Sequence, residues 1–353
     1  MFAKTLTDWY GENKRDLPFR KTKEPYKVWI SEIILQQTRV QQGLSYYLKF
    51  IEKYPTVSDL ANAEEEAVLK LWQGLGYYSR ARNLHFSAKY IRDELNGSFP
   101  TNYKDLLKLK GVGDYTASAI ASICFDEPTA VVDGNVYRVL ARFFGISTAI
   151  NSTKGIKDFK ELAQSLLDKS DPGTYNQAIM EFGAIVCKPQ NPVCIECKLS
   201  ERCYAYSNRK IEVLPVKEKK IKIRHRYFNY LVIHSAKNEL LLERRSEGIW
   251  KNLYQFPLIE SDKQLSEKAL LAHAAIEKHL ANNEEVHLLN EEVHLLNEEP
   301  IVHKLTHQHI YANFWSIRSA STYKGAVPFE EIHQYPVPKL IENFLNEYTF
   351  TEQ

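Results

Sequence analysis

The stretch YKDLLKLKGVGDYTASAIASICF, residues 103–125, joins two helical patterns through the turn Gly111-Val112-Gly113. Glycine allows the backbone of a tight turn, and the free N–H groups at the start of a second helix favour an anion. The stretch therefore predicts a helix–hairpin–helix, with Gly111 and Gly113 against a phosphate. Two glycines standing alone are more often a plain helix–helix turn, so this interpretation depends on the rest of the chain.

The chain around this stretch changes pattern once. Residues 1–208 carry apolar side chains at three- and four-residue steps, which predicts a mostly helical domain in which Asn62 caps a helix over 63–75. Residues 209–224 hold seven Lys or Arg against two Glu and are expected to form a basic linker, either solvated or in contact with phosphate. Short alternating runs then predict an α+β domain over 225–353.

Composition is that of a soluble globular protein. Hydrophobic residues make up 44% of the chain and charged residues 25%, with a formal net charge of +2. No run approaches the roughly 18 apolar residues of a membrane span, and the first residues lack the apolar core of a signal peptide. We therefore expect a cytoplasmic protein of bacterial type that does not engage a membrane.

Four of the five cysteines lie within seventeen residues, at Cys187, Cys194, Cys197 and Cys203. Four thiolates in so short a span suit a tetrahedral zinc site or a [4Fe-4S] cluster. The flanking six- and five-residue spacings differ from the paired C-x2-C knuckles of a zinc ribbon and favour the cluster. A pair of disulfides is a third possibility, which a reducing compartment disfavours.

These features together indicate a known superfamily. The cysteine run, the Gly111–Gly113 turn and the segment Asp133-Gly134-Asn135-Val136 resemble the endonuclease III superfamily of DNA glycosylases. Two further motifs, WISEIILQQT (29–38) and GLGYYSRARN (74–83), resemble those of the adenine DNA glycosylases, the MutY family. The resemblance covers essentially the whole chain and is strongest over 18–203. It implies a [4Fe-4S] cluster held by the four cysteines.

The resemblance also implies catalytic roles. Breaking an N-glycosidic bond requires a proton for the leaving base and stabilisation of the positive sugar, which two carboxylates can supply. Glu32, among apolar neighbours that raise a carboxyl pKa, is expected to be the general acid that protonates adenine N7. Asp133 is expected to remain ionised and to stabilise the oxocarbenium ion, with Tyr115 and Asn135 orienting both groups. Without the motifs, Glu32 would be interpreted as an exposed helix residue and Asp133 as a helix N-cap.

Position 115 separates two kinds of glycosylase. In lyase members of the superfamily, a lysine at this position attacks the sugar and forms an imine. A phenol cannot form an imine, so Tyr115 predicts a monofunctional enzyme that leaves the DNA strand intact.

The resemblance further implies contacts with DNA, since the target base must leave the duplex before it can react. Residues expected to wedge into the helix or to contact the opposite base are Gln37, Thr38, Leu75 and Tyr77; further expected DNA or adenine-pocket contacts are Arg80, Arg20 and Gln177. Core packing is the alternative for Leu75 and Tyr77. We expect Leu75 to be exposed because it lies between two glycines.

The second domain resembles a MutT-like (Nudix) domain, the part that recognises 8-oxoguanine in this family. It lacks the glutamate-rich Nudix box, so nucleotide hydrolysis is not expected. Leu305-Thr306-His307 aligns with the family's Phe-Ser-His loop, which makes Thr306 and His307 the candidate lesion readers; a core histidine at a strand end is the alternative for His307. The repeat of NEEVHLL, at 283–289 and 290–296, is interpreted as an insertion in a surface connection.

The sequence therefore predicts a monomeric adenine DNA glycosylase that acts on double-stranded DNA containing adenine opposite 8-oxoguanine or guanine. Such an enzyme would associate with the nucleoid through its DNA. The alternatives are a pyrimidine-lesion glycosylase with lyase activity, disfavoured by Tyr115; a non-catalytic lesion-binding protein, disfavoured by Glu32 and Asp133; and a nucleotide pyrophosphohydrolase, disfavoured by the missing Nudix box.

Overall fold

The structure, a computed structural model, describes residues 1–218, 223–237, 239–280, 293–319 and 321–348. The chain forms two compact units. The first comprises Met1–Asn62 and Asn83–Lys219, and the second comprises Ala63–Arg82 and Lys220–Gln353. The second unit thus includes a short segment from within the helical half of the sequence. The domain limits expected from the sequence, 1–208, 209–224 and 225–353, stay a prediction.

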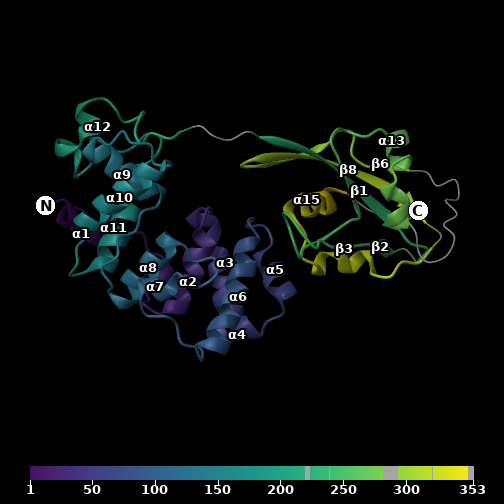
Figure 1. Cartoon of the computed structure of the whole chain (residues 1–353), viewed down its shortest axis with the longest axis horizontal. Helices are drawn as coiled ribbons and strands as arrows, with labels where there is room; N and C mark the ends of the chain where they lie inside the picture. The colour runs from purple at the N-terminus through teal and green to yellow at the C-terminus, as the bar shows by residue number, and fades with distance from the viewer. Residues whose placement is uncertain (219–222, 238, 281–292, 320, 349–353) are drawn as a thin grey trace. The chain divides into compact units, whose positions relative to one another are not determined.

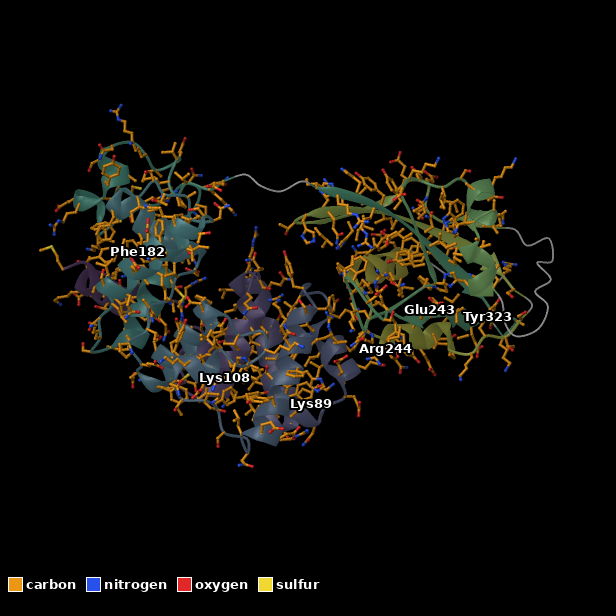
Figure 2. The ribbon with its side chains drawn as sticks, in the orientation of Figure 1. Lys89, Lys108, Phe182, Glu243, Arg244 and Tyr323 are labelled. Atoms are coloured by element: carbon orange, nitrogen blue, oxygen red, sulfur yellow. The ribbon has the colours of Figure 1, made fainter. Side chains whose placement is uncertain are left out.

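The first unit is helical, as predicted (Figure 1). Its elements are α1 (Phe2–Asn13), η1 (Pro18–Arg20), α2 (Pro25–Leu35), α3 (Val40–Lys53), α4 (Val57–Asn62), most of α6 (Ser79–Glu94), α7 (Tyr103–Leu106), α8 (Asp114–Phe125), α9 (Gly134–Phe144), α10 (Thr153–Leu166), α11 (Pro172–Ile185), η2 (Ser200–Arg202) and α12 (Tyr204–Ser207). Large apolar side chains fill its core. Phe182 of α11, labelled in Figure 2, packs edge-to-face on Trp9 with ring centroids 4.9 Å apart.

The predicted helix–hairpin–helix is present, with α7 as its short first helix and α8 as its second. Gly111 has φ +86°, and a Cβ atom there would lie 2.8 Å from Cβ of Asn83 on α6. Glycine is therefore required twice, by the backbone conformation and by the close packing. Gly113 is the N-cap of α8, and a Cβ atom there would meet no atom within 4 Å.

The motif over 29–38 ends one helix and turns into the next. Helix α2 begins at Pro25, where a missing N–H costs nothing, and ends at Leu35. Gln37 has φ +56°, an uncommon conformation for a residue other than glycine, and α3 begins at Val40. The break leaves Glu32 on α2 and places Gln37 and Thr38 in the connection.

The second unit contains a mixed sheet with the strand order β6-β8-β1-β2-β9, in which β5 also pairs with β1 and β7 with β8. Its elements are α5 (Glu65–Trp72), β1 (Arg224–His234), β2 (Glu239–Leu241), β3 (Glu243–Arg244), β4 (Tyr254–Gln255), β5 (Leu258–Ser261), α13 (Glu267–Leu271), α14 (Ala275–Leu280), β6 (His294–Leu295), β7 (Ile301–Leu305), β8 (Gln308–Arg318), β9 (Ala326–Pro328), η3 (Phe329–Gln334) and α15 (Lys339–Glu347). Strands β1 and β8 run parallel and pair over their full length, from Arg224↔Gln308 to His234↔Arg318.

Helices cover both faces of this sheet (Figure 1). On one face Leu231 and Ile317 belong to a buried cluster with Leu270 of α13 and Ile276 of α14. On the other, Phe344 of α15 stacks on Phe314 of β8 with ring centroids 3.7 Å apart. Both strands contain a continuous run of buried residues, because successive side chains point to opposite faces of the sheet and each face has its own core. The predicted α+β class of this half is confirmed.

Three expectations need adjustment. Asn62 ends α4, and Glu64 is the N-cap of α5, so the predicted cap at Asn62 is wrong. The first part of the expected linker is packed rather than solvated: Leu214 is buried, and Ile150 donates its N–H to Val216 O at 3.0 Å. The first copy of the heptad lies outside the described residues, and the second ends in β6.

In the described part of the chain, no helix is both long and apolar enough to cross a membrane.

Candidate active site

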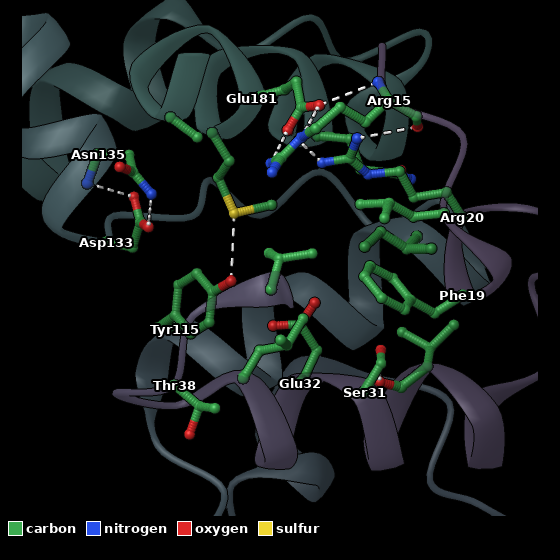
Figure 3. Close-up of a pocket in the computed structure, with 18 residues that line it drawn as sticks. Arg15, Phe19, Arg20, Ser31, Glu32, Thr38, Tyr115, Asp133, Asn135 and Glu181 are labelled. Atoms are coloured by element: carbon green, nitrogen blue, oxygen red, sulfur yellow. Dashed lines mark hydrogen bonds and ion pairs between the residues drawn. The ribbon is translucent and has the colours of Figure 1, made fainter. Parts of the chain in front are cut away.

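The first unit encloses a cavity of about 190 Å³ at the meeting point of α2, α8, α9 and α11 (Figure 3). It gathers seven of the predicted residues from five separate parts of the sequence. These are Arg20, Glu32, Thr38, Tyr115, Asp133, Asn135 and Gln177.

Glu32 lies on α2 with apolar neighbours on either side in the helix. Its side chain is half-buried and lines the cavity, so the alternative of an exposed helix glutamate is wrong. Burial raises the pKa of Glu32 from 4.5 to about 7; the Tyr115 phenol opposes this rise, the Asp133 carboxylate adds to it, and Arg20 opposes it. A carboxyl group with a pKa near 7 holds its proton in a large fraction of molecules at neutral pH, as a general acid requires.

Tyr115 lies in the first turn of α8, directly after the hairpin. Its hydroxyl donates to Sδ of Met180 on α11 at 3.2 Å, and burial together with the Glu32 and Asp133 carboxylates raises its pKa well above the ordinary value. The phenol therefore stays neutral and lies beside both carboxylates (Figure 3).

Asp133 is the N-cap of α9, accepting from the N–H groups of Asn135 at 2.9 Å and Val136 at 2.8 Å. The capping role considered from the sequence is thus confirmed, and the same carboxylate lines the cavity. Its second oxygen accepts from Nδ2 of Asn135 at 2.7 Å. Burial raises the pKa of Asp133, and the hydrogen bonds from Val136 and Asn135 oppose that rise. Asn135 in turn accepts from Arg138 at 2.8 Å, which fixes the orientation of its amide.

Glu181 lines the cavity and was not among the site residues predicted from the sequence. Glu181 of α11 has a fully buried side chain and pairs with Arg15 at 2.6 Å and Arg20 at 2.7 Å. Burial raises the pKa of Glu181, but the hydrogen bonds from Arg20 and Arg15 outweigh it and lower the pKa to about 2. Glu181 stays ionised and fixes both guanidinium groups. No local pattern in the sequence indicates this triad, because Glu181 is more than 160 positions away from both arginines.

Gln177 lies one turn before Glu181 on α11, and its Oε1 accepts from the Tyr10 hydroxyl at 2.9 Å. Arg20 also stacks over the Tyr10 ring, with its guanidinium carbon 5.6 Å from the ring centroid. Both predicted pocket residues are therefore held by side chains from α1 and α11.

The other predicted DNA contacts lie elsewhere. Gln37 is exposed in the α2–α3 connection and does not line the cavity. Leu75, Tyr77 and Arg80 belong to the second unit. Leu75 and Tyr77 lie in the turn between α5 and α6, and Arg80 lies in the first turn of α6. Tyr77 is 53% exposed with φ +48°, so core packing does not account for it.

One expectation for this turn is corrected, and a second residue beside it is buried. Leu75 is only 7% exposed, so the prediction of an exposed leucine between glycines is wrong. Arg80 is buried, and its guanidinium donates to the carbonyls of Leu75 at 3.3 Å and Gly76 at 3.1 Å; its contact with DNA stays a prediction. Burial lowers the pKa of Arg80 to about 10. Since Arg80 satisfies the carbonyls of the turn, it supports the shape of the turn from within.

The candidate lesion readers Thr306 and His307 form the exposed turn between β7 and β8. His307 is therefore not the core histidine considered as its alternative. Oγ1 of Thr306 lies 3.1 Å from the Tyr77 hydroxyl. Two residues predicted to contact the same base are thus hydrogen-bonded within one compact unit.

The four clustered cysteines, Cys187, Cys194, Cys197 and Cys203, line one small apolar cavity of about 30 Å³. All five cysteines of the chain are free thiols. Within the described ranges, no three His, Cys, Asp or Glu side chains are grouped closely enough to hold a metal ion. The donor set still fits a four-thiolate cluster, because all four side chains line the same cavity. The buried Arg142 donates to Sγ of Cys187 at 3.5 Å and to Lys188 O at 2.7 Å, which adds a positive charge beside the thiols.

Comparison with known proteins agrees with this geometry. Residues 30–165 match the HhH-GPD superfamily of base excision DNA repair proteins, and residues 229–347 match the NUDIX domain. The adenine DNA glycosylase of Buchnera aphidicola subsp. Baizongia pistaciae is 35% identical over 321 residues, covering 90% of this chain and 86% of that protein. The chain belongs to the adenine DNA glycosylase family.

Further relatives place this family member within its superfamily. The adenine DNA glycosylase of Buchnera aphidicola subsp. Schizaphis graminum is 38% identical over 259 residues, covering 73% of this chain and 74% of that protein. The solved structure of a thermostable thymine-DNA glycosylase is 33% identical, with a TM-score of 0.55, and covers 59% of this chain and 95% of that one. The helical part of the chain therefore has the fold shared by the superfamily, and membership of the family places the chain in base-excision repair.

Proposed function

We propose that this protein is a monofunctional adenine DNA glycosylase that removes adenine opposite 8-oxoguanine or guanine in double-stranded DNA. The observation that carries the proposal is that Glu32, Asp133 and Tyr115 line the same cavity, and that the pKa of Glu32 is raised to about 7. Two carboxylates supply the acid and the charge that N-glycosidic cleavage requires, and the position of a lyase lysine holds a phenol.

In the proposed reaction, protonated Glu32 gives its proton to N7 of the extruded adenine. The bond between C1′ and N9 then breaks, and its electron pair leaves with the neutral base. Asp133, whose carboxylate is oriented by Asn135, stabilises the oxocarbenium ion. Glu32, now ionised, takes a proton from water as the water oxygen bonds to C1′, which leaves an abasic sugar in an intact strand.

The cavity wall opposite Glu32 is proposed to hold the base. Arg20 presents a guanidinium fixed by Glu181, and Gln177 presents an amide fixed by Tyr10. Both groups can hydrogen-bond the edge of a purine, and their fixed orientation lowers the entropy lost on binding. We also propose that Glu181 contributes to base binding by fixing the guanidinium of Arg20.

The remaining predicted residues are proposed to hold the duplex. Gln37, Thr38, Leu75 and Tyr77 would open the helix and contact the opposite base, with Leu75 requiring a change from its buried position. The turn at Gly111 and Gly113 would approach a phosphate with its free N–H groups. Thr306 and His307 would distinguish 8-oxoguanine from guanine.

The four clustered cysteines are proposed to hold a [4Fe-4S] cluster. Arg142 would offset part of its negative charge, since its guanidinium already lies against the Cys187 sulfur. When bound, such a cluster ties the 187–203 loop together and supplies a redox-capable centre.

Incubating the protein with a duplex that contains adenine opposite 8-oxoguanine tests the proposal. The adenine strand is expected to remain intact until alkali is added and then to break at the adenine position. Borohydride is expected to trap little covalent adduct, because Tyr115 cannot form an imine. Strand cleavage without alkali, together with efficient trapping, would contradict the monofunctional assignment.

A further inference from the structure

The turn between α5 and α6, residues Gly74–Tyr77, is bracketed by two side chains that bind the same residue. Before the turn, Oε1 of Gln73 accepts from the N–H of Val337 at 3.3 Å. After it, the Tyr78 hydroxyl donates to the carbonyl of Val337 at 3.2 Å. Both backbone groups of one buried residue are therefore bonded by the two ends of the turn. We call Gln73, Tyr78 and Val337 the Val337 clasp.

Neighbouring contacts strengthen the clasp. Nε2 of Gln73 donates to Glu342 of α15 at 2.8 Å, and Nζ of Lys70 donates both to Gln73 Oε1 at 3.0 Å and to Tyr335 O at 3.1 Å. The hydroxyl of Tyr78 also accepts from the N–H of Gly74 at 3.4 Å, inside the turn itself. Val337 and Tyr78 are buried, so the hydrogen bond between them is shielded from water, and the surrounding bonds of Gln73 and Lys70 are partly buried.

The same turn carries Tyr77 at its tip, hydrogen-bonded to Thr306 of the β7–β8 turn at 3.1 Å. The clasp therefore anchors Gly74–Tyr77 to Val337, while Tyr77 bonds the turn that bears the candidate lesion readers. None of the clasp residues lines the catalytic cavity.

We infer that the Val337 clasp is a specificity device: it positions Tyr77 relative to Thr306 and His307 so that the two turns meet the same base opposite adenine. Gln73 and Tyr78 are positioning residues that act through Tyr77 and Thr306. The inference rests on the proposed function, in which those turns read 8-oxoguanine. It predicts that loosening the clasp reduces the preference for 8-oxoguanine over guanine and leaves the chemistry in the cavity unchanged.

The test compares single-turnover excision of adenine opposite 8-oxoguanine with excision opposite guanine, using the full-length protein. Y78F removes one hydroxyl and keeps the ring. Y254F is the matched control, because it removes a hydroxyl that donates to Glu66 at 2.9 Å, at the beginning of α5 and away from the turn. Y78F loses the hydrogen bond to Val337 O and the longer one from the N–H of Gly74. Loss of the first alone corresponds to roughly a five-fold change, so the 8-oxoguanine-to-guanine rate ratio is expected to fall at least about five-fold in Y78F and to stay unchanged in Y254F.

A charge exchange provides a rescue. Q73E places a second carboxylate next to Glu342 and is expected to lower the ratio, whereas the double variant Q73E/E342Q restores a donor–acceptor pair and is expected to recover most of it. A purely structural role would lower the thermal midpoint and both rates together, without changing their ratio. That result, or an unchanged ratio in Y78F and Q73E, would overturn the proposed specificity role of the Val337 clasp.

The proposed function fails in a different way. If the wild-type protein does not excise adenine, or if T306A/H307A leaves the ratio unchanged, the lesion-reading assignment is wrong. If T306A/H307A lowers the ratio while Y78F and Q73E do not, the assignment of Thr306 and His307 as lesion readers is supported and the positioning role of the Val337 clasp is refuted.

Discussion

Glu32 and Asp133 differ in chemistry although both are carboxyl groups in one cavity. Glu32 has apolar helix neighbours and a pKa near 7, whereas Asp133 accepts two backbone N–H groups at the beginning of α9. Hydrogen bonds to an ionised carboxylate favour its charged form, and burial without them favours the neutral form. Burial raises the pKa of both carboxyl groups, but at Asp133 the hydrogen bonds oppose the rise, which supports the proposed roles of Glu32 as the acid and Asp133 as the stabilising charge.

Replacing Glu32 by Gln keeps the shape of the side chain and removes the transferable proton. Single-turnover excision of adenine is expected to fall by at least about 10²-fold, the scale of lost general acid catalysis, while duplex binding persists. Excision assays and a gel-shift titration measure the two effects. Q36E, a charge change at the end of the same helix, serves as a control for altered charge near α2. A near-normal excision rate in E32Q would remove Glu32 from the mechanism.

The same substitution predicts a pH-dependent change in stability. Between pH 4.5, the ordinary pKa of Glu, and about pH 7, the unfolded chain loses a proton that folded Glu32 retains. The folded state then binds more protons, so the Glu32 contribution to the free energy of unfolding falls as pH rises through this window. Gln carries no charge, so E32Q is expected to gain thermal stability relative to wild type at pH 8 and not at pH 4. Equal differences at both pH values would show that the Glu32 pKa is not raised.

At the scale of elements, the 187–203 loop is held against the end of the helical unit by buried arginines. Arg138 donates to Cys187 O at 2.6 Å and to the Asn135 side chain at 2.8 Å. The loop that bears the cysteines and the turn that bears Asp133 are therefore joined through one guanidinium.

Purified protein is expected to be brown and to contain about four irons per chain, as a four-thiolate iron–sulfur centre requires. Metal analysis of C197S is expected to show loss of iron, whereas C124S should keep it. Cys124 lies in α8, outside the clustered four, and burial raises the pKa of its thiol to about 12. Colourless wild-type protein with one zinc per chain would refute the cluster.

The β7–β8 hairpin carries a prediction of its own. In T306A/H307A, loss of one or two hydrogen bonds to 8-oxoguanine, each on the order of 1 kcal/mol or more, is expected to reduce discrimination roughly ten- to a hundred-fold. Excision opposite guanine should change much less, because Glu32 and Asp133 lie in the other compact unit. The ratio of single-turnover rates on the two duplexes measures the effect. H309A, on β8 just beyond the turn, is the control that should keep the ratio.

At the scale of the whole molecule, each compact unit is made of two separate segments of the sequence. Helix α5 and the turn after it belong with the strand-rich part, where Glu65 pairs with Arg244 of β3 at 3.4 Å and Lys70 bonds Tyr335. Figure 2 labels Arg244 on that strand.

Ending the chain at residue 218 is therefore expected to have two separable effects. The catalytic and cysteine cavities keep all their lining residues, so excision opposite guanine should persist. The preference for 8-oxoguanine should be lost along with Thr306, and the thermal midpoint should fall because the polar side chains of α5 lose their partners. Excision assays on both duplexes and a thermal melt check these outcomes. A truncated chain that keeps the preference would place the lesion reader in the helical part.

The sequence by itself determined what local pattern and chemistry can encode: the helix–hairpin–helix around Gly111, the α+β class of the second half and the grouped cysteines. It also proposed Glu32, Tyr115 and Asp133 as catalytic residues, and the structure brings these three into one cavity. Each of these depends on residues a few positions apart or on motifs long enough to identify a family. Only the tertiary structure decided how distant segments meet. Glu181 reaches Arg20 across 161 positions, and Gln73 and Tyr78 meet Val337 across more than 250 positions, so no local pattern could show these contacts. The burial of Leu75 and Arg80 likewise depends on how the rest of the chain packs around their turn. Exposure of a residue between two glycines is likewise set by what packs on it, and a local pattern carries no information about that partner.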